Sequence, residues 1–312
     1  MKIAFLFPGQ GSQYVGMAKE FIENFAESRE VFEAANDALG FDLAHLCAQG
    51  PVEKLNLTEN TQPAILASSI AILRPLERRG VSAVVAAGHS LGEYTAITCA
   101  GGLAFKDAVA LVQKRGRYMQ EAVPAGAGLM AAILGMERLD VEKTCLDASK
   151  NGIVAPANYN SPGQIVIAGD ATAVEVACAQ ARERGAKRTL PLPVSAPFHC
   201  ALMAPAAGKL ALELARVRFS DARPPIVTNV EAEPNADGER IAELLRAQVT
   251  APVRFVEMVK RMRELGVTKL LEIGPGRVLT GLIGRIDRGL ARANLAVLGD
   301  LPAAERFVSA GD

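Results

Sequence analysis

A serine in a tight glycine turn is the first candidate for chemistry. The segment Gly88-His89-Ser90-Leu91-Gly92 has the pattern G-x-S-x-G and lies between an apolar run at 81–87 and a helical pattern from 91, the context of a nucleophile elbow. Glycines on both sides of Ser90 permit the sharp turn because they carry no Cβ. The turn would place the Ser90 hydroxyl at a helix N-terminus, where the dipole and the Leu91 amide favour developing negative charge. A plain strand-to-helix turn is the alternative, and the context favours a nucleophile.

A serine hydroxyl needs a base, and the chain has three histidines, His45, His89 and His199. His89 lies inside the elbow with its side chain directed away from that of Ser90, and His45 lies in an apolar helical stretch. His199 follows Pro197-Phe198 in a loop that leads into a helix, where catalytic side chains are often displayed. We therefore expect His199 to be the base, and a helix-capping or packed histidine is the alternative. No acidic residue is marked by its position to orient the imidazole, which weakens a plain hydrolase interpretation.

One arginine on the second helix expected after the elbow could recognise an anion. Arg115 lies in the segment QKRGRYM, with Tyr118 and Met119 on its helical face. A guanidinium there could hold a carboxylate through two parallel hydrogen bonds. From the residues alone, the favoured interpretation is that Arg115 is one of three cations on a solvated helix face.

The turn after the first strand, Gly9-Gln10-Gly11, offers backbone amides. It fails the dinucleotide fingerprint, because Tyr14 stands at the third glycine position, and no P-loop Lys-Ser/Thr pair follows. An amide from this turn, beside that of Leu91, would complete an oxyanion hole.

Length and composition bound the rest. With 312 residues the chain can form two packed units or one large α/β unit with an insertion. Half of the residues are apolar, and 34 basic side chains balance 34 acidic ones, which argues against broad binding to nucleic acid or an anionic membrane. Five scattered cysteines without a C-x-x-C pair favour a reducing cytoplasm over a zinc site or a disulfide framework. No apolar run is long enough for a signal segment or a membrane span.

Strand and helix patterns predict an α/β body with a parallel sheet. The body's expected strands are 3–7, 81–87, 225–230 and 269–273, and its expected helices are 12–25, 30–39, 61–78, 91–100, 106–120, 201–216, 237–248 and 253–265. Between them, strands 129–134, 153–158, 164–168 and 187–192 and helices 139–149 and 171–184 follow the β-α-β-β-α-β order of a ferredoxin-like unit.

The expected fold is therefore α/β, with an α/β-hydrolase-like body and an insertion. We predict a large catalytic domain of residues 1–125 and 194–312 and an inserted ferredoxin-like small domain of residues 126–193. The tail after Pro302 is expected to be dispensable.

Taken together, the chain resembles the malonyl-CoA:acyl carrier protein transacylases of type II fatty acid synthesis. The resemblance spans nearly the whole chain, and its motifs occur in the family's order and approximate spacing. They are FPGQGSQ from Phe7, TQPA from Thr61, GHSLGEY from Gly88, NYNSPGQ from Asn158, PFHCALM from Pro197 and GPGRVL from Gly274.

The resemblance implies a role for each matching residue. Ser90 would be the nucleophile, His199 the base, and the amides of Gln10 and Leu91 the oxyanion hole. Arg115 would hold the free carboxylate of the malonyl group, which replaces the solvated-face interpretation. The main-chain carbonyl of Gln248 would orient His199, explaining the missing acid.

Two further residues are expected at the substrate. Asn160 matches a segment that faces the cleft in this family, and we expect a substrate contact there. Phe198 precedes the histidine, and its bulk would leave little room for an α-methyl branch, which favours malonyl over methylmalonyl.

The implied reaction is a ping-pong transfer through a malonyl-serine, from malonyl-CoA to acyl carrier protein, without metal or redox cofactor. We expect a cytoplasmic monomer that presents a basic rim to its acidic carrier protein. The candidates for this rim are Arg182, Arg184, Lys187, Arg188, Lys260, Arg261 and Arg263, and each run could equally be a solvated helix face. The alternatives are a serine esterase or thioesterase, a malonyl transferase for polyketide synthesis or malonate decarboxylation, and an inactive scaffold.

Overall fold

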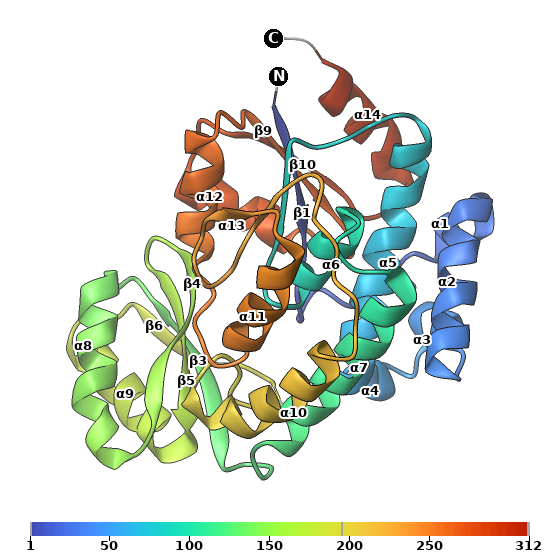
Figure 1. The fold of residues 1–312 in the computed structure, drawn as a ribbon. Helices are drawn as coiled ribbons and strands as arrows, with labels where there is room; N and C mark the ends of the chain where they lie inside the picture. The colour runs from blue at the N-terminus through green and yellow to red at the C-terminus, as the bar shows by residue number, and fades with distance from the viewer. Residues whose placement is uncertain (1, 195, 311–312) are drawn as a thin grey trace.

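The computed structural model describes residues 2–194 and 196–310. Figure 1 shows a larger body beside a smaller part that carries its own sheet. The body's sheet has six strands, all parallel except the last. In sheet order they are β10 (Ala291–Leu295), β9 (Lys269–Ile273), β1 (Ile3–Phe7), β2 (Val85–Gly88), β7 (Ile226–Val227) and β8 (Pro234–Asn235).

Helices surround this sheet because both of its faces are apolar. In β1, alternate residues enter two different cores: Phe5 and Phe7 pack into one, and Ala4 and Leu6 into the other, as the two-residue period of a strand requires. The body's helices are α1 (Lys19–Asn24), α2 (Ala26–Leu39), α3 (Leu43–Gln49), α4 (Val52–Leu55), α5 (Thr58–Arg78), α6 (Leu91–Cys99), α7 (Phe105–Glu121), α10 (Ala204–Leu214), α11 (Gly238–Gln248), α12 (Phe255–Glu264), α13 (Val278–Ile286) and α14 (Leu301–Ser309). Short 3₁₀ helices span Ala201–Met203 and Leu298–Asp300.

The smaller part is an antiparallel sheet with two helices. Its strands, in sheet order, are β4 (Val154–Ser161), β5 (Gln164–Asp170), β3 (Gly128–Leu134) and β6 (Arg188–Pro191). Helices α8 (Arg138–Ala148) and α9 (Ala171–Glu183) complete a β-α-β-β-α-β chain order, with a 3₁₀ turn at Ser149–Asn151. This strand order is that of the ferredoxin-like unit, so the expected fold class is confirmed. The boundaries of two domains stay a prediction.

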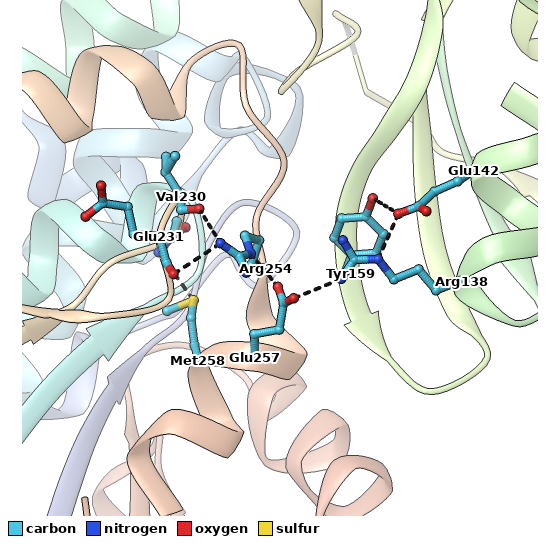
Figure 2. A network of polar contacts seen from close by, with 9 residues as sticks. Arg138, Glu142, Tyr159, Val230, Glu231, Arg254, Glu257 and Met258 are labelled. Atoms are coloured by element: carbon cyan, nitrogen blue, oxygen red, sulfur yellow. Dashed lines mark hydrogen bonds and ion pairs between the residues drawn. The ribbon is translucent and has the colours of Figure 1, made fainter. Parts of the chain in front are cut away.

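The two parts meet along β4. Backbone hydrogen bonds of 2.9 Å join Tyr159 N to Val253 O and Val253 N to Ala157 O. Beside them lies a cluster of charged and aromatic side chains, which we call the joint and which Figure 2 shows. The joint consists of Arg138, Glu142, Tyr159, Arg254 and Glu257. It ties α8 of the smaller part to α12 of the body.

Near the ends of the chain, one expected helix is wrong and the tail forms a helix of its own. The helix expected over 12–25 forms only as α1, because Gly16 and Ala18 adopt positive φ values of 101° and 59°. The segment after Pro302 belongs to helix α14, which buries Leu301 and Ala304 against the core, so that its dispensability stays a prediction. No helix within the described ranges is long and apolar enough to cross a membrane.

Candidate active site

The turn that carries Ser90 has the strained backbone of an elbow. Ser90 lies between β2 and α6 with φ 53° and ψ −106°, a conformation that residues other than glycine rarely adopt. A Cβ on Gly92 would lie 2.1 Å from Phe7 O, so only glycine lets the first turn of α6 pack on the end of β1. The turn therefore presents Ser90 at the carboxyl end of the central strands.

Of the three histidines, the structure brings His199 to Ser90. Ser90 Oγ lies 2.6 Å from His199 Nε2, and His199 Nδ1 lies 2.8 Å from the main-chain oxygen of Gln248. A carbonyl oxygen can only accept, so Nδ1 carries the proton and Nε2 is free to accept from the serine. Burial, with the nearby charge of Arg115, lowers the pKa of His199 to about 3. The imidazole is therefore neutral, as a general base must be.

The other two histidines are placed elsewhere. His45 is exposed on α3. The ring of His89 turns to the smaller part, where its Nε2 lies 2.8 Å from Asn160 Oδ1. Neither has a hydrogen bond to Ser90 among the described residues.

Arg115 is buried at the site, and its placement on a solvated helix face is wrong. Its residue is only 2% exposed. The neighbouring Gly116 makes this possible, since a Cβ there would lie 2.5 Å from Thr58 O, where α7 crosses the start of α5. The guanidinium donates to Gln62 Oε1 at 2.7 Å, to Gln248 Oε1 at 2.9 Å and to Ser90 Oγ at 3.2 Å.

Two buried side chains that were not predicted from the sequence, Asn229 and Glu93, support the elbow through hydrogen bonds. Asn229 Oδ1 accepts from Ser90 N at 2.7 Å, and its Nδ2 donates to Gly88 O at 2.7 Å. Glu93, 1% exposed, accepts from Asn229 N at 3.2 Å and from Gln248 Nε2 at 2.6 Å. Burial raises the pKa of Glu93 to about 7, although these hydrogen bonds and the charge of Arg115 oppose the shift.

Sequence signals for these residues were uneven. Glu93 lies in the motif GHSLGEY and Gln62 in the motif TQPA, both of which carry the family resemblance, so the sequence did hold a signal for these two residues. Asn229 stands in no quoted motif and is 139 residues from the serine whose amide it holds.

A cavity between the two parts opens onto Ser90 and His199. Gln10 and Phe198 border it, together with His89, Met130, Asn158, Leu192 and Val194. Leu91 begins α6, so its amide has no acceptor within the helix. Asn160 is not among the lining residues; it contacts His89, and Asn158 of the same strand lines the cavity instead.

The described ranges, 2–194 and 196–310, hold no group of three or more histidine, cysteine or acidic side chains that could bind a metal ion.

Comparison with known proteins identifies the family. Residues 4–299 match the acyl transferase domain family. The chain is 50% identical over 286 residues to the malonyl CoA-acyl carrier protein transacylase of Escherichia coli (strain K12), with 91% of this chain and 93% of that protein covered. The chain belongs to the malonyl CoA-acyl carrier protein transacylase family.

Other members of this transacylase family agree in sequence and fold. The transacylase of Bacillus subtilis (strain 168) is 48% identical over 290 residues, covering 93% of this chain and 92% of that protein. The crystal structure of an acyl carrier protein S-malonyltransferase from Vibrio cholerae has a TM-score of 0.95 at 48% identity, covering 97% and 100% of the two chains. A malonyl-transacylase in complex with a type II PKS acyl-carrier protein has a TM-score of 0.95 at 47% identity, covering 97% and 99%. The expected family and enzyme class, an acyltransferase, are thus confirmed.

Proposed function

We propose that this enzyme transfers the malonyl group of malonyl-CoA to the phosphopantetheine thiol of an acyl carrier protein, for fatty acid synthesis. The observation that carries the proposal is the position of Arg115. Its guanidinium is buried, is held by two amide oxygens and lies 3.2 Å from Ser90 Oγ. An acyl group on Ser90 that ends in a carboxylate would bring that carboxylate to this charge.

The first half-reaction forms the malonyl-serine. His199 Nε2 takes the proton of Ser90 as Oγ attacks the thioester carbonyl, and the amides of Gln10 and Leu91 receive the oxyanion. When the tetrahedral intermediate collapses, the carbon–sulfur bond breaks and His199 returns the proton to the CoA sulfur. The 2.6 Å contact between Ser90 and His199 and the lowered pKa of the imidazole support these roles.

The second half-reaction is the reverse, with a different thiol. His199 takes the proton of the phosphopantetheine thiol, whose sulfur attacks the malonyl-serine carbonyl, and Ser90 leaves with that proton. These two half-reactions need neither a metal nor a redox cofactor. The name of the transacylase solved with a carrier protein supports an acyl carrier protein as the acceptor.

Acyl selectivity would come from Arg115 and Phe198. An acetyl group would leave the buried guanidinium without an anionic partner, which favours malonyl. Phe198 borders the cavity and is 8% exposed, which supports its role in limiting space for an α-methyl branch. For Asn160, the contact with His89 supports an indirect role at the edge of the substrate site.

Carrier-protein docking would use the cations that are not engaged within the chain. Of the predicted rim, Arg184, Arg261 and Arg263 form ion pairs with acidic side chains of their own part. Lys187, just before β6, and Arg188, its first residue, are exposed and form no ion pair among the described residues. The strand that they begin runs toward Leu192, which lines the cavity. We propose these two as the first contacts for an acidic carrier protein.

The remaining parts of the proposal concern the state of the protein. All five cysteines are free thiols, which supports a cytoplasmic location. A monomer is proposed, and its molar mass in solution would test this.

The deciding experiment is single-turnover transfer. We expect mass spectrometry after brief exposure to malonyl-CoA to show one malonyl adduct on Ser90, which a cognate carrier protein then removes. Malonyl-CoA, acetyl-CoA and methylmalonyl-CoA are compared as donors, and malonyl should react fastest. An adduct on Cys99 or Cys200 would overturn the serine assignment, and rapid hydrolysis of malonyl-CoA without carrier protein would indicate a thioesterase.

A further inference from the structure

We propose that Glu93 is a positioning residue for acyl selectivity: it fixes the amide of Gln248 so that Arg115 is held by neutral oxygens and its charge remains available to the substrate. The inference rests on the proposed function and adds a residue to it. Glu93 does not touch the cavity, so it would act only through its neighbours.

Two acceptors, Glu93 Oε2 and Ser90 O, fix the direction of the Gln248 amide. Its Nε2 donates to Glu93 Oε2 at 2.6 Å and to Ser90 O at 2.8 Å, and its Oε1 accepts from Arg115 at 2.9 Å. A carboxylate and a carbonyl can only accept, so they select the nitrogen end of the amide. The oxygen end is left facing Arg115. Rotation of the amide by half a turn would place an N–H donor against the guanidinium donors.

Glu93 is itself held by the backbone of Asn229. Its Oε1 accepts the main-chain N–H of Asn229, whose side chain spans Ser90 N and Gly88 O. The carboxylate is thus tied to the turn that carries the nucleophile. One buried group therefore links the geometry of Ser90 to that of the arginine 25 residues away in the sequence.

The charge of Arg115 has no anion in direct contact with it among the described residues. Gln62 and Gln248 both offer neutral amide oxygens, so the guanidinium is oriented without being neutralised by direct contact. Above its pKa of about 7 Glu93 is ionised and supplies the anionic acceptor that orients Gln248, and no ion pair between Glu93 and Arg115 occurs among the described residues. A substrate carboxylate can then become the first anion in contact with Arg115.

The test compares malonyl-CoA and acetyl-CoA as donors in the wild type and in Glu93→Gln at about pH 8, above the pKa of Glu93, where the wild-type carboxylate is ionised. The substituted amide presents one donor and one acceptor, so it cannot accept from both Asn229 N and Gln248 Nε2. We expect kcat/KM for malonyl transfer to fall about 10- to 100-fold, the effect of losing one hydrogen bond to a charged group. Acetyl transfer should fall less than about 3-fold, since it does not use the charge of Arg115.

A matched pair of variants separates positioning from general damage. Glu93→Asp keeps an anionic acceptor and should restore part of the malonyl preference. In Gln248→Met the main-chain carbonyl that orients His199 is retained while the amide is lost, so malonyl preference should fall. Adding Glu93→Gln to that variant should then lower the preference no further.

Each outcome has a separate meaning. Equal losses for both donors, or additive effects of the Glu93 and Gln248 changes, would overturn the positioning role. If Glu93→Gln does not fold, Gln248→Met still tests the amide link, and unchanged malonyl preference in it overturns the proposal. If the wild type shows no preference for malonyl, the proposed function fails first, whatever Glu93 does.

Discussion

Arg115 in the active site and Arg138 in the joint both connect side chains from different elements, but Arg115 does so through neutral oxygens and Arg138 through carboxylates. Arg138 donates to the carboxylates of Glu142 at 2.8 Å and Glu257 at 2.9 Å, and its guanidinium stacks 4.0 Å from the Tyr159 ring centroid. Figure 2 shows these contacts continuing through Glu257 to Arg254. Arg115 is held by two amide oxygens instead. The joint pairs its arginines with carboxylates, whereas the arginine of the active site has no carboxylate partner among the described residues.

The acidic residues of the two regions differ in the same way. Burial raises the pKa of Glu93 to about 7. Burial also acts on Glu257, yet the hydrogen bonds from Arg254 and Arg138 outweigh it and lower the pKa of that carboxyl. Contact with two guanidinium groups makes Glu257 a stable anion, whereas Glu93 contacts only amide donors. Direct ion pairing therefore connects the two parts at the joint, and neutral partners surround the arginine for which we propose a role in substrate recognition.

Removing the charge of Arg115 should give the largest effect. In Arg115→Ala, kcat/KM for malonyl transfer should fall about 10²- to 10³-fold or more, the effect of deleting one partner of a buried ion pair. Acetyl transfer, which makes no such pair, should change far less. Steady-state transfer from both donors measures this, with Arg138→Ala in the joint as the matched control. Equal losses for malonyl and acetyl would contradict the carboxylate clamp.

The second-largest effect should come from giving Arg115 a carboxylate partner, as Arg138 has. Gln62→Glu would place a carboxylate where an amide oxygen now lies 2.7 Å from the guanidinium. This internal anion would compete with the substrate, so we expect malonyl kcat/KM to fall about 10- to 100-fold, mainly through KM. Gln62→Met, which supplies no charge, is the control and should cost less. A smaller loss in Gln62→Glu than in Gln62→Met would show that charge competition is not the cause.

The sequence predicted which residues carry the chemistry better than it predicted what surrounds them in the folded chain. Strand β1 was placed at its observed bounds because an apolar run followed by Pro8-Gly9 is a local signal. The pairing of Ser90 with His199 followed from having few histidines and one elbow. Burial of Arg115 could not be predicted from its own helix, because it depends on α5, whose residues are about 50 positions away. The adjacent Gly116 was the one local sign of close helix packing.

Elements with weak local signals were missed near the C-terminus. Helix α13 contains Gly281 and Gly284, which lower helix propensity, and β10 has the sequence ARANL, which is poor in β-branched residues. Both elements form because of tertiary contacts. β10 pairs at the edge of the sheet, and α13 packs into the core that contains Ala4 and Leu6. Asn229 was missed for a related reason: a single polar side chain gains its role only when the chain brings it behind the elbow.

The pH dependence of the free energy of unfolding should distinguish the buried acid Glu93 from the buried base His199, because their contributions change with pH in opposite directions. Between about pH 4.5 and 7, Glu93 is protonated in the folded state and ionised in the unfolded state, so its contribution to the free energy of unfolding falls as pH rises. Between about pH 3 and 6.5, His199 is neutral when folded and protonated when unfolded, so its contribution rises with pH. Each slope should approach about 1.4 kcal/mol per pH unit in the shared window.

Urea unfolding of the wild type, Glu93→Gln and His199→Gln at about pH 5 and about pH 6 measures both slopes. The wild type's stability relative to Glu93→Gln should decrease between these values, and its stability relative to His199→Gln should increase. Slopes of the same sign would show that burial does not set both protonation states.

The smallest effect should come from breaking the joint. Glu257→Gln removes the anion shared by Arg138 and Arg254, and because these side chains are 29–47% exposed, the free energy of unfolding should fall by only about 0.5–1 kcal/mol. The loss should shrink in high salt, which screens partly exposed charges. Lys260→Gln, an exposed cation on the same helix, is the control for a general change of surface charge. Because the joint holds the two parts together without touching Arg115, the ratio of malonyl to acetyl transfer should stay within about 2-fold of the wild type. A larger shift of that ratio would mean that the paired arginines of the joint and the charged arginine of the active site are energetically coupled.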